Sequence, residues 1–178
     1  MAYLIKHMRV IYSLDERILY YIQRKVKCKA LDFIFPKISV LGNGGLIWIF
    51  ISIILMFNRD YQKSGLLILL GLSIGFILCN LCLKPLAARP RPCWNNKNVK
   101  LLIPVPSDYS FPSGHTISSV IASVILSVTV QFGYIAIPVA VLISFSRLYL
   151  YVHYPSDILA SIISGMLISS FILHFICI

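Results

Sequence analysis

Charged side chains are scarce in this sequence: Asp, Glu, Lys and Arg together account for 12% of its 178 residues. Soluble domains average about 25% charged and about 45–50% apolar residues, whereas this chain is 58% hydrophobic. A water-soluble fold of this length cannot bury so much apolar surface. The composition therefore excludes an ordinary soluble domain and predicts one membrane-embedded domain over residues 1–178.

Acidic residues are the scarcer charged group, with 6 Asp+Glu against 16 Lys+Arg and a formal net charge of +10. In a soluble protein this excess would suggest binding to nucleic acid. Here no soluble basic domain remains once the long apolar runs are set aside. We therefore expect contact with bilayer lipids and an anionic lipid substrate, and no nucleic-acid partner.

Cysteine is also sparse, and its odd count of five does not form a disulfide framework. Cys79 and Cys82 form a C-x-x-C inside an apolar run, where packing is favoured over redox or zinc chemistry. A bridge between Cys28 and Cys93 stays open. The spacing of Cys, His and Asp matches no zinc site, and no carboxylate group suits magnesium, so we expect neither metal nor cofactor.

Long uncharged runs predict an all-α, polytopic helix bundle in the cell membrane. The run 116–146 would form a helix of about 46 Å if unbroken, well beyond a hydrocarbon core of ~30 Å. A turn near Gly133 would divide it into two spans. The predicted layout has about five transmembrane helices, at 38–57, 64–83, 116–132, 134–152 and 157–176.

The N-terminal segment 1–37 alternates apolar and basic positions. Ser13 as N-cap, with Glu16 three residues on, predicts a helix over 13–29. Its apolar residues recur at helical intervals: Leu14, Ile18, Tyr21 and Ile22. An amphipathic helix at the membrane interface and a simple packing helix are equally favoured. The first 30 residues have no uninterrupted apolar h-region, so we expect the first span to act as its own insertion signal.

Three polar blocks meet at one membrane edge in this layout. They are KPLAARPRP with Lys84, Arg89 and Arg91, FPSGH with Ser113, Gly114 and His115, and SRLYLYVHYPSD with Arg147, His153 and Asp157. Lys and Arg side chains favour an anion, and the Arg fork matches phosphate oxygens. A serine and a glycine at a helix start can add a hydroxyl and backbone N–H groups. The blocks therefore predict a phosphate site.

Two histidines can divide the chemistry at such a site. Asp157 follows His153 by four residues, a spacing that places both on one helical face. A carboxylate on the second ring nitrogen would leave the attacking nitrogen unprotonated, which favours His153 as nucleophile. His115 is then the general acid, and Lys and Arg stabilise the developing charge.

The spaced pattern K-x6-R-P, P-S-G-H and S-R-x5-H-x3-D, over residues 84–157, resembles the type 2 phosphatidic acid phosphatase superfamily. The resemblance implies that His153 forms a phosphohistidine, that Asp157 orients it and that His115 protonates the leaving group. The residues implied to hold the phosphate are Lys84, Arg91, Ser113, Gly114 and Arg147. Arg89 is not one of the positions that this family pattern specifies. Soluble relatives use the same cradle for vanadate, a role that the predicted spans argue against here.

The expected function is metal-independent hydrolysis of a lipid phosphate or diphosphate. On family grounds the candidate substrates are undecaprenyl diphosphate, which is slightly favoured, phosphatidylglycerophosphate and phosphatidate. Transfer of the phosphoryl group to another lipid stays an alternative. A non-catalytic lipid-binding protein would tolerate decay of the three blocks, and none is decayed. A channel or transporter would need more polar residues within the spans.

The side of the membrane is predicted by two conflicting arguments. The family resemblance implies an extracytoplasmic active site. Of the 16 Lys+Arg, only Arg59 and Lys63 fall on the opposite edge, which leaves 14 on the active-site side. The positive-inside rule would put that side in the cytoplasm. We expect the outer face. Many bacterial members have six spans, whereas here an interfacial helix stands where a first span would precede.

Overall fold

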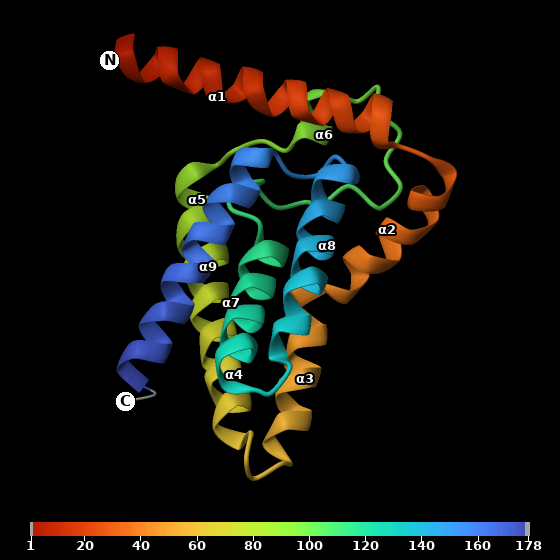
Figure 1. The fold of residues 1–178 in the computed structure, drawn as a ribbon. Coiled ribbons are helices and arrows are strands. Elements are labelled where there is room, and N and C mark those ends of the chain that lie inside the picture. Colours follow the sequence, from red (N-terminus) through yellow and green to blue (C-terminus); the bar gives the residue numbers. More distant parts are fainter. Residues whose placement is uncertain (1, 177–178) are drawn as a thin grey trace.

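The computed structural model describes residues 2–176, with side chains from 10 to 175. All of the regular secondary structure in this range is helical (Figure 1), which confirms the predicted all-α class. The elements are, in order, α1 (Ala2–Tyr21), η1 (Ile22–Val26), α2 (Lys29–Leu41), η2 (Asn43–Gly45), α3 (Leu46–Met56), α4 (Gln62–Phe76), η3 (Ile77–Leu83), α5 (Lys84–Ala87), α6 (Pro92–Asn95), α7 (Gly114–Thr129), η4 (Gly133–Ile135), α8 (Ala136–Tyr149) and α9 (Pro155–Ile176).

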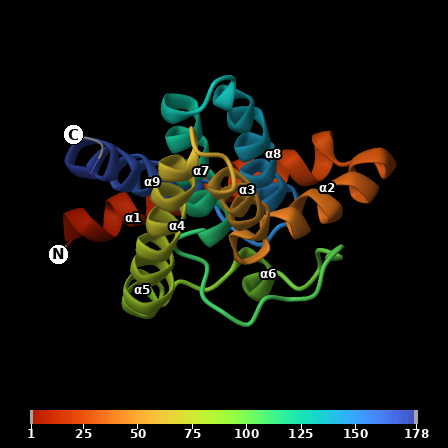
Figure 2. The same cartoon turned by 90° about the horizontal axis from the view of Figure 1, so that it is seen from below.

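Helix α7 lies at the centre of the bundle, in contact with α4, α8 and α9 (Figure 2). Its buried residues Ile117, Ile121 and Ile125 recur every four positions, so they form one stripe of the core. The outer helices keep large apolar side chains exposed, among them Phe50 and Leu167. Large apolar side chains thus lie both in the core and on the outer surface, which suits a lipid environment and agrees with the membrane assignment.

Two stretches are long and apolar enough to cross a membrane, Gln62–Asn95 and Pro155–Phe175. A third qualifies if α2 and α3 count as one span bent by 46°, and the apolar helices Gly114–Thr129 and Gly133–Tyr149 are shorter. The number of five spans therefore stays a prediction. The bounds 38–57 are wrong for the first one, because the helix starts at Lys29 and breaks at Gly44 and Gly45, where φ is +57° and +71°.

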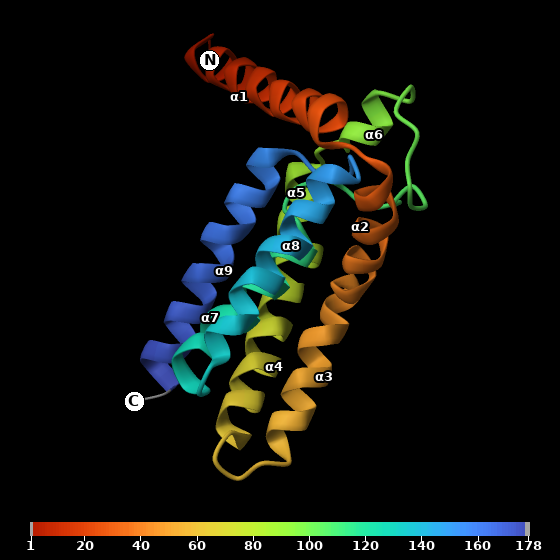
Figure 3. The same cartoon turned by 45° about the vertical axis from the view of Figure 1, so that its right-hand side comes forward.

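The turn predicted near Gly133 is confirmed. Helix α7 ends at Thr129, and a short 3₁₀ turn leads into α8. A Cβ on Gly133 would lie 1.9 Å from the backbone oxygen of Leu126, so only glycine fits this tight reversal. Because α7 and α8 run in opposite directions, the start of α7 and the end of α8 lie at the same end of the bundle (Figure 3).

Helix α1 lies across that same end of the bundle (Figures 1 and 3). The predicted bounds 13–29 are wrong: the helix begins at Ala2 and continues through η1 to Val26, so Ser13 is not its N-cap. Its buried residues are Asp15, Leu19 and Ile22, whereas most of the predicted apolar face is exposed, namely Leu14, Ile18 and Tyr21. Asp15 points inward because its carboxylate has hydrogen-bond and ion-pair partners in the bundle, Arg89 and Ser156.

The possible bridge between Cys28 and Cys93 is not formed. Both residues are free thiols, as are Cys79 and Cys82. Cys79 is buried and packs in the core cluster around Ile117 and Ile121, the packing role expected of it.

Candidate active site

The predicted site residues gather at the end of the bundle that α1 covers. A cavity of about 570 Å³ lies between the α2–α3 break, the end of α4 and the start of α7. Six of the eight predicted residues line it or approach it: Lys84, Arg91, Gly114, His115, Arg147 and His153. The other two, Ser113 and Asp157, are fully buried. The sequence blocks therefore do converge in space.

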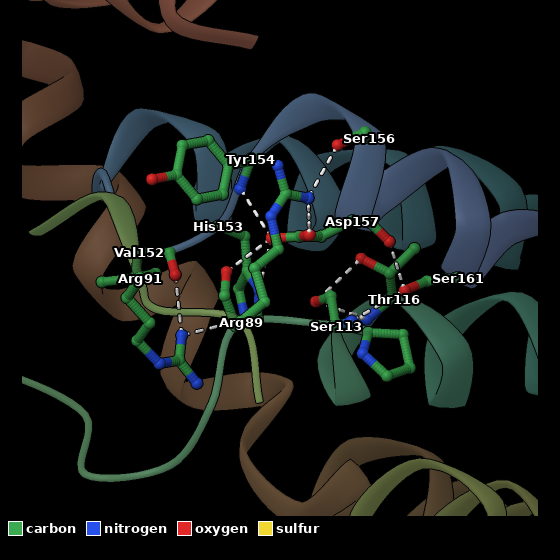
Figure 4. A network of polar contacts seen from close by, with 12 residues as sticks. Arg89, Arg91, Ser113, Thr116, Val152, His153, Tyr154, Ser156, Asp157 and Ser161 are labelled. Atoms are coloured by element: carbon green, nitrogen blue, oxygen red, sulfur yellow. Dashed lines mark hydrogen bonds and ion pairs between the residues drawn. The ribbon is translucent and has the colours of Figure 1, made fainter. Parts of the chain in front are cut away.

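Arg91 reaches His153 directly (Figure 4). Its Nη1 donates to the carbonyl oxygen of Val152 at 2.7 Å and lies 3.1 Å from Nε2 of His153. A guanidinium has only donors, so Nε2 must be the acceptor in this contact. The neutral ring therefore carries its proton on Nδ1, and the lone pair of Nε2 points toward the cationic side of the cavity.

His153 lies in the turn before α9, and Asp157 lies in the first turn of that helix. The spacing predicted that both residues lie on one helical face. In the structure α9 begins between them, at Pro155, so His153 precedes the helix and only Asp157 belongs to it. Nδ1 of His153 is 3.7 Å from Oδ2 of Asp157, longer than a hydrogen bond, and Nδ1 has no hydrogen-bond partner. Oδ2 instead accepts from Ser110 and from the backbone N–H of Tyr154.

Burial lowers the pKa of His153 to about 3, against the opposing effect of Asp157, and the charges of Arg91 and Arg147 lower it further. The ring is therefore neutral at pH 7 before substrate binds. A neutral imidazole whose Nε2 carries no proton is the form required of a nucleophile.

Lys84 and Arg91 share a carboxylate that the sequence argument did not include. Asp108, in the loop between α6 and α7, forms an ion pair with Lys84 and accepts from Nη2 of Arg91 at 2.7 Å. Burial raises the pKa of Asp108, but the Lys84 hydrogen bond and the Arg91 charge outweigh it and lower the pKa to about 2. The Asp108 carboxylate therefore lies at the position where Lys84 and Arg91 could bind a phosphate.

The start of α7 departs in part from the expectation. Ser113 is its N-cap, with a hydroxyl that accepts from the N–H of Thr116 at 3.5 Å, while its own N–H donates to Ser161 at 2.8 Å. The Ser113 hydroxyl therefore caps α7 in the substrate-free protein, whereas the sequence pattern predicted that it would bind phosphate. His115 faces the α2–α3 break, where its Nε2 lies 2.9 Å from Oδ1 of Asn43.

Arg147 is 4% exposed and donates to Ser39 of α2, while its Nε has no partner. No carboxylate pairs with it among the ion pairs of the described residues. A buried cation without a counter-charge is costly unless an anion completes it. The cavity side of Arg147 is therefore suited to a bound anion.

Arg89, Asp108 and Asp15 belong to this polar network. Sequence reasoning grouped Arg89 with Lys84 and Arg91 near the phosphate but outside the family motif, and it gave Asp108 and Asp15 no role. Asp108 had a readable signal, because it is the single acidic residue of the loop 85–112, which follows Lys84 directly and contains Arg91. Arg89 forms an ion pair with Asp157 and another with Asp15. Among the described residues, no group of three or more His, Cys, Asp or Glu side chains could hold a metal ion.

The family model for the PAP2 superfamily matches residues 64–176, more than half of the chain and all three blocks. The chain belongs to the PAP2 superfamily. It is 32% identical over 125 residues to an undecaprenyl-diphosphatase of Sulfolobus acidocaldarius, an alignment that covers 69% of this chain and 60% of that one. It is 29% identical over 150 residues to the undecaprenyl-diphosphatase BcrC of Bacillus subtilis, covering 82% and 75%.

Several solved structures share the fold of this chain. LpxE of Aquifex aeolicus superposes with a TM-score of 0.80 at 25% identity, over 91% of this chain and 96% of that one. A transmembrane PAP2-type phosphatidylglycerolphosphate phosphatase of Bacillus subtilis superposes with 0.75 at 28% identity, over 93% and 86%. A bacterial vanadium-dependent iodoperoxidase, 18% identical, shares the fold alone, with a TM-score of 0.71 over 92% and 48%.

Proposed function

We propose that this PAP2 protein is a membrane lipid phosphatase that works through a phosphohistidine on His153. The observation that carries the proposal is the contact between Arg91 and Nε2 of His153, which presents the ring's lone pair to a cavity lined by cations. A phosphate held by Arg91 would lie next to that lone pair. In this arrangement the proposed nucleophile and the groups proposed to bind phosphate would already be within reach of each other when substrate binds.

In the proposed reaction, Nε2 of His153 attacks phosphorus and the bond from phosphorus to the leaving oxygen breaks. His115 gives its proton to that oxygen, and the phosphoryl group stays on His153. A water then attacks phosphorus, passes its proton back to His115 and releases inorganic phosphate. Lys84, Arg91 and Arg147 carry the charge of the phosphoryl oxygens throughout.

Asp157 would stabilise the imidazolium that forms on His153 during transfer. Its carboxylate is 3.7 Å from Nδ1 in the substrate-free protein. A small rotation of the ring would close this gap, and catalytic hydrogen bonds commonly shorten only when substrate is bound. Asp108 would leave Lys84 and Arg91 as phosphate takes its place, which its half-exposed position in a loop allows.

The cavity also provides room for the lipid part of a substrate. Beyond the cations its walls include apolar side chains, Leu72 and Phe76 on α4 and Val40 and Ile117 elsewhere. A phosphate at the polar end would leave an attached lipid chain beside these side chains. Undecaprenyl diphosphate is the favoured substrate, because the relatives from Sulfolobus and Bacillus are undecaprenyl-diphosphatases. Phosphatidylglycerophosphate and phosphatidate are the other candidates.

The proposed topology is multi-pass, with about five spans and the active site on the extracytoplasmic face. A cysteine introduced at Lys97, an exposed residue of the loop after α6, tests the side. In a variant whose native cysteines are replaced by serine, an impermeant thiol reagent applied to intact cells should label it. Labelling only after the cells are broken would put the site in the cytoplasm.

The test of the function is phosphate release by the purified chain in detergent, with EDTA present, from each of the three lipids. The parent should release phosphate from at least one of them, and His153→Asn should release none. Lys100→Gln, on an exposed loop residue, serves as the control and should match the parent. A phosphorylated lipid acceptor formed in place of free phosphate would instead indicate a phosphotransferase. Equal release by parent and His153→Asn would contradict the mechanism.

A further inference from the structure

The guanidinium of Arg89 joins the N-terminal helix to the buried Asp157. Its Nη1 forms an ion pair with Asp157 and donates to the hydroxyl of Ser156 at 2.8 Å (Figure 4). Its Nη2 pairs with Asp15 of α1 at 2.7 Å. One planar cation thus bridges two carboxylates that come from opposite ends of the sequence.

Asp15 is 2% exposed, and each of its oxygens is used. Oδ1 accepts from the backbone N–H of Ser156 at 2.9 Å, and Oδ2 accepts from the Ser156 hydroxyl at 2.6 Å as well as from Arg89. Asp15 therefore binds the start of α9, where the helix dipole favours a negative charge. That start is the turn which presents Asp157 to His153.

Aromatic rings hold Arg89 from two further sides. The guanidinium carbon is 4.7 Å from the ring centre of Tyr12 and 4.2 Å from that of Tyr154. Tyr12 lies three residues before Asp15, so both side chains reach inward from the same side of α1. Helix α1 thus contributes one charge and one ring to the surroundings of Asp157.

The charges explain why a second carboxylate is needed. A guanidinium paired with Asp157 alone would draw that carboxylate's charge toward itself and weaken its attraction for a positive ring on His153. Asp15 supplies the second negative charge and leaves Asp157 able to stabilise the imidazolium. The partners behind a catalytic group commonly set its orientation and basicity in this way.

We propose that Asp15 is a positioning residue for the phosphatase reaction, acting on Asp157 through Arg89 and the start of α9. The proposal rests on the function proposed above. It makes α1 part of the active site, whereas an interfacial anchor alone would need only apolar and basic residues. Such an anchor role predicts no effect of the inward carboxylate on turnover.

The test compares Asp15→Asn, Asp15→Glu and Glu16→Gln in the full-length chain purified in detergent, with a lipid phosphate as substrate. Glu16 is the exposed neighbour of Asp15 and is the matched control. Asp15→Asn should lower kcat at least tenfold while KM stays within about twofold. Asp15→Glu, which restores the charge, should recover kcat to within about threefold of the parent, and Glu16→Gln should match the parent.

Parent-like kcat in Asp15→Asn would overturn the inference while leaving the phosphatase intact. An equal loss in Asp15→Asn and Asp15→Glu would also overturn it, because charge would then not matter. If Asp15→Asn does not yield folded protein, Ser156→Ala decides, since it removes one donor to Asp15 and keeps both carboxylates. A threefold loss of kcat at constant KM supports the inference, and no loss overturns it. A parent without activity contradicts the proposed function, and this inference with it.

Discussion

Nη1 of Arg91 lies 3.1 Å from Nε2 of His153, and Nη2 of the same guanidinium lies 2.7 Å from the carboxylate of Asp108. Arg91 therefore contacts both the proposed nucleophile and Asp108, the carboxylate that pairs with two of the cations proposed to bind phosphate. When a phosphate replaces that carboxylate, the guanidinium would hold it beside the nitrogen that attacks it. In the proposed mechanism, Arg91 therefore positions the phosphate relative to His153.

Arg91→Lys should lower kcat/KM by about 100-fold or more, although it keeps the positive charge. A lysine cannot contact Val152, His153 and a phosphate at once, because it lacks the planar fork of a guanidinium. Phosphate release at several substrate concentrations gives the value. Lys97→Arg, at an exposed position, provides a control that should not change the rate. A lysine variant as active as the parent would show that charge alone is needed.

The loss of kcat caused by His115→Ala should depend on the leaving group of the substrate. If His115 protonates the leaving oxygen, its loss should lower kcat by about 10²–10⁴-fold on a lipid monophosphate, the usual range for general acid catalysis. The p-nitrophenolate ion leaves without needing a proton, so on p-nitrophenyl phosphate the loss should be at least tenfold smaller. Steady-state rates on both substrates make the comparison. Equal losses would instead assign His115 to phosphate binding.

Asp108→Asn should bind phosphate analogues more tightly than the parent. The carboxylate competes for Lys84 and Arg91, and a neutral amide would compete less. We expect the inhibition constant of orthovanadate to fall by about tenfold, with product inhibition by phosphate rising in parallel. Asp60→Asn, at an exposed position in the α3–α4 loop, is the matched control. Unchanged inhibition would mean that Asp108 does not occupy the phosphate position.

The stability of the protein should fall in acid partly because of His153. Its pKa is lowered to about 3 in the folded chain, against about 6.5 in an unfolded one. Between these values the unfolded state binds more protons, so stability falls as the pH drops from about 6.5 toward 3. Thermal unfolding in detergent at pH 7.5 and 5 should show this loss. The loss should be smaller by several degrees in His153→Asn, and an identical loss in both proteins would contradict the assignment.

Much of the site is readable from the sequence because it depends on local patterns. The uncharged run after His115 is too long for one span, so a turn near Gly133 had to return Arg147 to the same end. The tight contact of Gly133 with Leu126 shows why the chain reverses there. Lys84 and Arg91 follow their span directly, which places them at that end without further information.

The remaining features depend on long-range contacts that leave no periodic signal. Asp15 and Arg89 are 74 residues apart. Hydropathy alone left open whether the apolar face of α1 meets the bundle or the membrane, and in the structure Leu14 and Ile18 of that face are exposed. Asp108 lies in an irregular loop, so its approach to Lys84 could not be placed. The break at Gly44 and Gly45 lies inside an uncharged run. Glycine carries no charge, so the hydropathy of the run gives no sign that the helix breaks there.

The most direct test of the central proposal is to trap the phosphoenzyme. The purified chain would be mixed with a ³²P-labelled lipid phosphate, quenched with alkali within milliseconds to seconds, digested and mapped. The account predicts a label that survives alkali, is lost in acid and lies on the peptide that contains His153, with none in His153→Asn. Turnover by the parent without labelled histidine, or with the label on another residue, would contradict it.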